Sequence, residues 1–137
     1  MDLEKAVKHR RDVWAANSIT NALAYRNEHD KPYLSVITVM EILRGLHRDI
    51  DPAKAERFKL SAPANFQFLD VTTGVSYLAS EIIGKLEDAR MTIGIADSLI
   101  AATAIQHGLV LVTANRKHFQ RVVDLGYSLT LQNWREK

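Results

Sequence analysis

Three polar side chains occupy places in this sequence where chemistry would be expected. Asp97 lies near the beginning of an otherwise small and apolar stretch, 93–104. Glu41 and Asn115 each come shortly after an apolar run of the chain. A carboxylate among apolar residues loses hydration energy unless a cation lies beside it. We therefore interpret Asp97 as a candidate ligand of a divalent cation, with Glu41 and Asn115 as candidate functional residues beside it.

Each of these residues could also have a purely structural role. Thr38 and Glu41 have the spacing of a capping box, in which the glutamate bonds back to the backbone amide at the helix start. Asp97 would be favoured in a first helical turn by the helix dipole. Asn115 is a common turn residue that accepts hydrogen bonds from its own backbone amides. These interpretations stay open at this point.

The elements that must position these residues alternate along the chain. Helical spacing of apolar residues predicts helices over 38–48, 53–60, 75–90, 97–107 and 115–126, and one or two more within the first 29 residues. Short apolar runs predict four strands, at 33–37, 66–70, 109–113 and 127–131. Alternating strands and helices predict a parallel sheet covered by helices on both faces. Ligands bind at the carboxyl-terminal edge of such a sheet, where the three candidate residues should converge.

Composition limits the classes of protein to be considered. The chain has 137 residues, of which 47% are hydrophobic, and this predicts a single domain, 1–137. It has no cysteine, which excludes disulfides, thiolate nucleophiles and cysteine-bound metals and fits a cytoplasmic protein. No apolar run reaches the roughly 18 residues of a membrane helix, so no membrane is expected as a partner. The six glycines are scattered singly, which disfavours a nucleotide-binding or small-molecule module with a glycine-rich loop.

Three cationic side chains flank the proposed site in the sequence. Arg44 lies one helical turn beyond the glutamate, and Arg116 and Lys117 directly follow the asparagine. They could hold the phosphates of a nucleic acid, although most such residues are simply solvated. His118, the next residue, is predicted to pack or to contact phosphate rather than to act as a general base.

Two strings carry a family resemblance. SVITVMEILRGL and ADSLIAATAIQHGLVLVTANRKHFQRV resemble the PIN domain, in particular the VapC ribonuclease toxins of bacterial toxin–antitoxin pairs, over about residues 33–134. The resemblance implies a PIN-like three-layer α/β sandwich with a parallel sheet. It also implies that Glu41 and Asp97 bind Mg²⁺ or Mn²⁺ and that Asn115 occupies the last and most variable catalytic position. Thr113 corresponds to a threonine whose hydroxyl supports the site.

The same resemblance implies an activity and partners. The activity is metal-dependent hydrolysis of RNA phosphodiester bonds, which needs no serine, cysteine or histidine nucleophile. Oxygen ligands without cysteine or histidine select Mg²⁺ or Mn²⁺ rather than zinc. The partners are RNA, a VapB-like antitoxin and a second copy in a homodimer. An amphipathic N-terminal segment with Trp14, Ile19 and Leu23 could make such contacts or could belong to the protein's own core.

The chain departs from the family pattern at its beginning. A PIN domain starts with a central strand ending in Asp-Thr-Asn or Asp-Thr-Asp, whose first aspartate is the central metal ligand. Aligning residues 8–11 with the basic end of the family's first helix leaves no such strand in this chain, and Asp2 is the only carboxylate near its place. We therefore expect a four-stranded sheet in which two strands close on each other or a partner donates a strand, unless residues are missing before the first one.

Loss of the first aspartate has a chemical consequence. Two carboxylates should hold a divalent cation more weakly than three or four. The sequence therefore predicts weak or absent catalysis, and the alternative function is an inert PIN-like module that binds protein.

Overall fold

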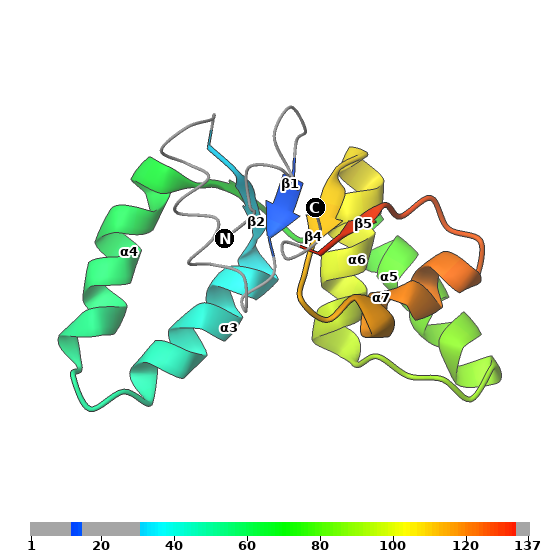
Figure 1. Cartoon of the computed structure of the whole chain (residues 1–137), viewed down its shortest axis with the longest axis horizontal. Helices are drawn as coiled ribbons and strands as arrows, with labels where there is room; N and C mark the ends of the chain where they lie inside the picture. Colours follow the sequence, from blue (N-terminus) through cyan, green and yellow to red (C-terminus); the bar gives the residue numbers. More distant parts are fainter. Residues whose placement is uncertain (1–11, 15–30, 134–137) are drawn as a thin grey trace.

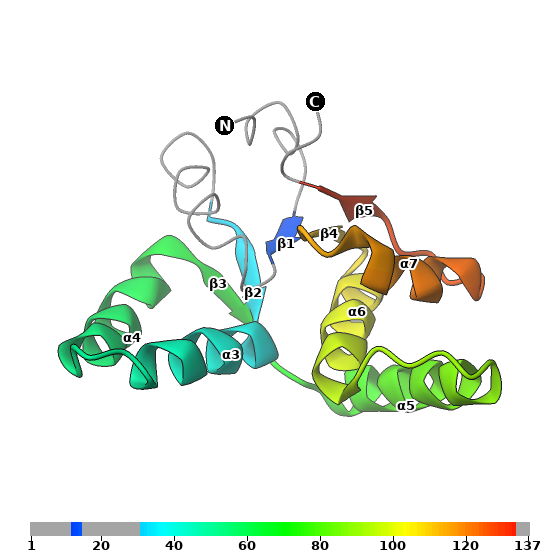
Figure 2. The same cartoon turned by 60° about the horizontal axis from the view of Figure 1, so that its bottom comes forward.

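The computed structural model describes residues 12–14 and 31–133 of the chain. Within these ranges the chain forms one parallel sheet of five strands and five helices, which confirms the α/β class. The strands are β1 (Asp12–Trp14), β2 (Tyr33–Ser35), β3 (Gln67–Leu69), β4 (Val110–Val112) and β5 (Leu131–Gln132). The helices are α3 (Val36–His47), α4 (Ala53–Asn65), α5 (Thr73–Asp88), α6 (Ile95–His107) and α7 (Arg116–Asp124). In Figures 1 and 2, α3 and α4 lie on the side of the molecule that holds β2 and β3, whereas α5, α6 and α7 lie on the side of β4 and β5.

The centre of the sheet is β1, in the strand order β3-β2-β1-β4-β5. Val13 aligns with Tyr33 of β2 and with Leu111 of β4, and both pairings are parallel. The prediction of a four-stranded sheet without a central first strand is therefore wrong, and neither a donated strand nor closure of β2 on β4 is needed. Residues 8–11 precede this strand, so their alignment with the end of the first helix is wrong as well. A strand of three residues is too short to show a two-residue period within a segment of near-helical spacing.

Helix α3 begins two residues earlier than predicted because Ser35 caps it. The Ser35 Oγ accepts hydrogen bonds from the backbone N–H groups of Ile37 and Thr38, each at 3.1 Å. Serine is a favoured residue at this position because its oxygen satisfies amides that have no partner within the helix. Strand β2 therefore ends at Ser35, and Thr38 lies inside the helix. The capping box proposed for Thr38 and Glu41 is wrong.

The later elements follow the predicted order. Helix α6 ends at Gly108 in the left-handed conformation, with φ 62°, as the glycine predicted. Strand β5 lies at Leu131–Gln132 rather than at 127–131. A tight turn, in which the Leu129 N–H donates to the Tyr127 carbonyl at 2.9 Å, occupies the beginning of the predicted segment.

The main core lies between the sheet and helices α5, α6 and α7. Leu111 and Val112 of β4 are fully buried, as expected of a strand covered on both faces. Helix α6 is buried along most of its length, and its small side chains allow close approach to α5, which crosses it (Figure 2). The buried residues of α6 are Ser98, Ile100, Ala101, Ala102, Thr103 and Ala104. A carboxylate at the beginning of this helix is thus carried on a rigid element.

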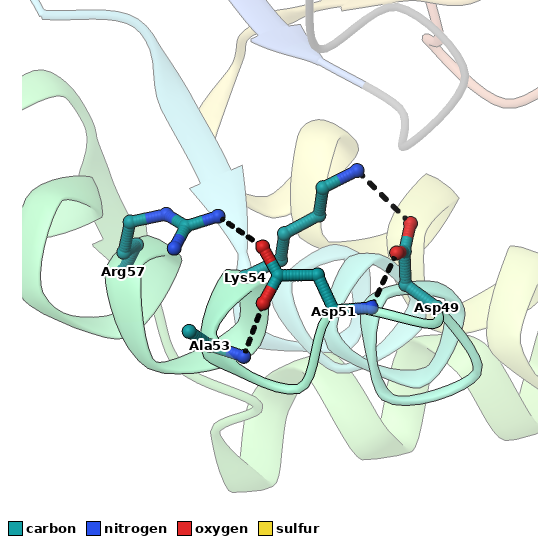
Figure 3. A network of polar contacts seen from close by, with 5 residues as sticks. All are labelled: Asp49, Asp51, Ala53, Lys54 and Arg57. Carbon is teal, nitrogen blue, oxygen red and sulfur yellow. Dashed lines mark hydrogen bonds and ion pairs between the residues drawn. The ribbon is translucent and has the colours of Figure 1, made fainter.

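The turn between α3 and α4 is held by polar contacts (Figure 3). Asp49 and Asp51 accept backbone hydrogen bonds from Asp51 and Ala53, at 2.9 and 3.0 Å. Lys54 pairs with Asp49 at 3.1 Å, and Arg57 pairs with Asp51 at 2.8 Å. These bonds lower the pKa of both aspartates. Exposed pairs of this kind add little stability, so their effect is to fix the shape of the α3–α4 hairpin.

Several predicted features lie outside the described residues. They are the N-terminal helices, Asp2, Ile19, Leu23 and Trp134. Among the residues that are described, no helix has the length and apolar character needed to cross a membrane.

Candidate functional site

The carboxyl-terminal ends of the strands meet the beginnings of three helices. Strand β2 continues directly into α3, and a short link, 113–115, joins β4 to α7. Helix α6 begins after Gly94, whose φ of 84° turns the chain into the helix. The beginnings of α3, α6 and α7 lie on the same side of the sheet (Figure 1). This is the edge at which open parallel sheets bind ligands.

Glu41 of α3 and Asp97 of α6 form the acidic part of this edge. Both residues are half-buried, and burial raises the pKa of each carboxyl group above its ordinary value. The charge of Asp97 raises the pKa of Glu41 further, whereas Arg44 lowers it. Like charges have this effect only at short range. The fold therefore brings together two acids that are far apart in the sequence.

His118 of α7 is a neighbour of Asp97 that sequence reasoning missed. Its Nδ1 lies 2.8 Å from Asp97 Oδ2, and the two side chains are 27% and 25% exposed. The contact lowers the pKa of Asp97, but burial has the larger, opposite effect. Asn115 and His118 are three residues apart at the start of a helix, which puts them on one side of it. That spacing is the signal that could have placed His118 at the site.

Asn115 precedes the first turn of α7. Its backbone N–H donates to Thr113 Oγ1 at 3.0 Å, and its side-chain Nδ2 lies 3.1 Å from His118 Nδ1. The side chain makes no capping hydrogen bond to the helix, so its interpretation as a turn residue bonded to its own backbone amides is wrong. Thr113 is 1% exposed, and its hydroxyl holds the turn that places the Asn115 side chain beside His118.

The three predicted cationic residues are exposed at the same edge. Arg44 lies one turn beyond Glu41 on α3, and its positive charge lowers the pKa of that carboxyl group. Arg116 and Lys117 form the first turn of α7. All three are therefore accessible to an anionic ligand that approaches the acids.

The residues at this edge fit a divalent cation as an incomplete set of ligands. Glu41 and Asp97 supply hard oxygen atoms, and a cation would relieve the repulsion that raises the pKa of Glu41. Thr38, one turn before Glu41, is fully buried, and its hydroxyl has no hydrogen-bond partner within residues 12–14 and 31–133. Those same residues contain no group of three His, Cys, Asp or Glu side chains that could hold a metal.

Strand β1 explains why the set is incomplete. Its one acid, Asp12, begins the strand and pairs with Val110 at the beginning of β4, away from the carboxyl-terminal edge. The residues that follow β1 in the sequence are Ala15, Ala16 and Asn17, where the PIN resemblance implies Asp-Thr-Asn or Asp-Thr-Asp. The chain thus has a first strand, and its sequence has no carboxylate at the three positions that follow the strand.

Replacing Glu41 with glutamine is expected to stabilise the metal-free protein slightly at neutral pH. Because its pKa is raised, Glu41 holds a proton more tightly in the folded protein than in the unfolded chain, so its ionisation costs folding energy. This cost is present above the raised pKa and disappears below the ordinary value of 4.5, where both states carry the proton. Thermal unfolding in a chelator should show a gain of a few tenths of a kcal/mol, the size typical of surface changes.

Glu87→Gln provides the control, because it makes the same change at an exposed acid of another helix, α5. It should leave the unfolding temperature unchanged. A loss of stability in Glu41→Gln at neutral pH, or a gain that persists in acid, would contradict the assignment of a repulsive acidic pair.

Comparisons with known proteins agree with the geometry. The PIN domain family matches residues 9–125. Ribonuclease VapC of Rickettsia bellii (strain RML369-C) is 33% identical over 102 residues, which cover 72% of this chain and 76% of that protein. Ribonuclease VapC1 of Rickettsia felis is 35% identical over 102 residues, with the same two coverages.

Solved structures share the fold. VapBC2 from Rickettsia felis, bound to a DNA fragment from its promoter, has a TM-score of 0.75 at 23% identity, covering 90% of this chain and 98% of that chain. FitAcB from Neisseria gonorrhoeae has a TM-score of 0.76 at 24% identity, covering 92% and 99%. The chain therefore belongs to the PIN domain family and, by its similarity to the VapC proteins, to the VapC-like members of that family.

Proposed function

We propose that this protein is a metal-dependent endoribonuclease and the toxin of a toxin–antitoxin pair. The observation that carries the proposal is the convergence of Glu41 and Asp97 at the carboxyl-terminal edge of the sheet, where each carboxyl group has a raised pKa. Relatives named ribonuclease VapC, at 33% and 35% identity, support the same reaction. A protein of this kind would act in the cytoplasm.

Glu41 and Asp97 would hold the cofactor, Mg²⁺ or Mn²⁺, with the amide oxygen of Asn115 as the third catalytic group. A bound divalent cation lowers the pKa of a water molecule and stabilises charge on the phosphodiester. Because these carboxylates are half-buried, they are partly shielded from bulk water. This strengthens their interaction with a cation. Thr113 keeps the 113–115 turn in shape through its bond to the Asn115 amide.

The RNA substrate would be held by its phosphates. Arg44 from α3 and Arg116 and Lys117 from α7 present positive charge on two sides of the acidic pair. Contacts of this type bind and orient nucleic acid without reading its sequence. Binding through them should therefore weaken as salt concentration rises.

The absence of an acid after β1 predicts that catalysis is weak. Ala15 follows the central strand in the sequence, so two carboxylates are left for the cation among the residues assigned here. Metal affinity depends on the number of deprotonated ligands. The same observation favours the second candidate function, an inert PIN-like module that binds protein.

The proposed partners are a VapB-like antitoxin and a second copy of the chain. Several solved structures with this fold are toxin–antitoxin complexes, among them VapBC from Salmonella typhimurium bound to DNA, with a TM-score of 0.75. An antitoxin that covers the edge formed by α3, α6 and α7 would block access of RNA to Glu41 and Asp97.

The experiment that tests the proposal is cleavage of a mixed, structured RNA pool by the purified chain with Mn²⁺. We expect slow cleavage that stops when a chelator is added and falls to background in Asp97→Asn. Asp124→Asn is the matched control, since Asp124 is an exposed acid at the end of α7 and should leave the rate unchanged.

Each outcome favours one of the two candidate functions. Cleavage that depends on Mn²⁺ and on Asp97 excludes the inert module. No cleavage by the natural chain, with Mn²⁺ binding retained, would favour the inert module. Cleavage that persists in Asp97→Asn would contradict the assignment of the site.

A further inference from the structure

His118 is held between Asp97 and Asn115 by one ring nitrogen. Nδ1 lies 2.8 Å from Asp97 Oδ2 and 3.1 Å from the side-chain Nδ2 of Asn115. A neutral imidazole nitrogen either donates its hydrogen or accepts one, and it cannot do both. The two contacts therefore compete for the same atom.

The carboxylate decides this competition. An ionised aspartate only accepts hydrogen bonds, so a favourable contact at 2.8 Å requires Nδ1 to carry the hydrogen. The Asn115 amide must then turn its oxygen toward the ring or leave the ring without a hydrogen bond. This assignment holds whether the imidazole is neutral or charged, since Nδ1 carries a hydrogen in both of these forms.

The ring is carried on a firmly packed helix. His118 follows Arg116 and Lys117 in the first turn of α7, and its backbone N–H donates to the Asn115 carbonyl at 3.2 Å. The next residue, Phe119, is 2% exposed, and Val122 is fully buried, so α7 is anchored in the core. A donor on such an element can hold a partner in one orientation.

We propose that His118 is a positioning residue for Asp97. By donating from Nδ1, it fixes Oδ2 and leaves the other carboxylate oxygen for the cation. The inference rests on the proposed function, because it gives Asp97 the role of a metal ligand. Hydrogen bonds that orient a ligand in this way commonly change metal affinity by about 10- to 100-fold when they are removed.

Two variants with the same amide group, His118→Asn and His118→Gln, test whether the position of the hydrogen-bond donor matters rather than the size of the side chain. In His118→Asn the amide nitrogen can stand near the place of Nδ1, whereas in His118→Gln it stands near the place of Nε2. The readout is the dissociation constant for Mn²⁺, measured by electron paramagnetic resonance on the natural chain, on these two variants and on His118→Leu. We expect His118→Gln and His118→Leu to bind Mn²⁺ about 10- to 100-fold more weakly, and His118→Asn to stay close to the natural chain.

Nitrogen-15 NMR of the metal-free natural chain gives a second readout that needs no variant to fold. For the neutral form of the ring, we expect His118 to carry its hydrogen on Nδ1. An Nε2–H ring in the natural chain would overturn the inference.

The outcomes also distinguish the inference from the proposed function. Equal or tighter Mn²⁺ binding by His118→Leu would overturn the positioning role while the metal site stands. If the natural chain binds no Mn²⁺, the metal-dependent function fails, and the tautomer of His118 still decides whether it orients Asp97.

Discussion

Replacing Ala15 with aspartate is expected to raise the affinity of the protein for Mn²⁺ by about tenfold or more, a gain of about 1.4 kcal/mol or more in binding free energy. Ala15 is the first residue after β1, the central strand of the sheet. An aspartate there would add a third carboxylate to Glu41 and Asp97 at the edge where parallel strands end. Metal affinity and RNA cleavage should rise together, since both depend on that ligand set.

Mn²⁺ titration and cleavage of the same RNA pool provide the measurement. Ala16→Asp adds the same charge one residue later and serves as the matched control, with little gain expected. The double variant Ala15→Asp with Asp97→Asn should lose the gain. Tighter Mn²⁺ binding without cleavage would favour the inert module, and no change in Mn²⁺ binding would contradict the assignment of Ala15 to the missing ligand position.

Replacing Leu111 with alanine is expected to lower the free energy of unfolding by about 2–5 kcal/mol. Leu111 is fully buried in β4, where it aligns with Val13 of β1 and with Leu131 of β5. Truncation removes apolar contacts and leaves a cavity between the sheet and its helices, which cannot collapse around a strand that is paired on both sides. A loss of this size is a large part of the stability of a typical domain.

Urea unfolding of the natural chain and the variant measures the loss. Leu60→Ala is the control with the same change in chemistry, because Leu60 of α4 is 82% exposed. It should alter the free energy of unfolding by no more than about 0.5 kcal/mol. A loss below about 1 kcal/mol in Leu111→Ala would contradict the placement of β4 in the core.

Strong periodic signals allowed most of the elements to be predicted. Helix α5 follows the spacing of Val75, Ala79, Ile82 and Leu86, all of which are buried. Helix α6 ends at Gly108, where the glycine indicated its end. These features are local, since they depend on residues within one or two turns of each other.

The weakest prediction concerned the central strand. Asp12–Trp14 is three residues long, and its strand conformation depends on hydrogen bonding to β2 and β4 on either side. Pairing with distant segments can override local preference, which is why a helical pattern was the wrong guide there. The position of Ala15 after the first strand became visible only when that strand was located.

The features of the candidate site also divide into those that the sequence indicated and those that only the tertiary structure showed. The sequence by itself indicated Glu41, Asp97 and Asn115, because polar residues after apolar runs of an alternating α/β pattern fall at one edge of a parallel sheet. Only the tertiary structure placed His118 Nδ1 2.8 Å from Asp97 Oδ2. Only there does the charge of Asp97 raise the pKa of Glu41. Residue types and spacing determine which elements form and which ends carry polar groups. Distances between side chains on different elements depend on how those elements pack, and packing is set by contacts between residues far apart in the chain.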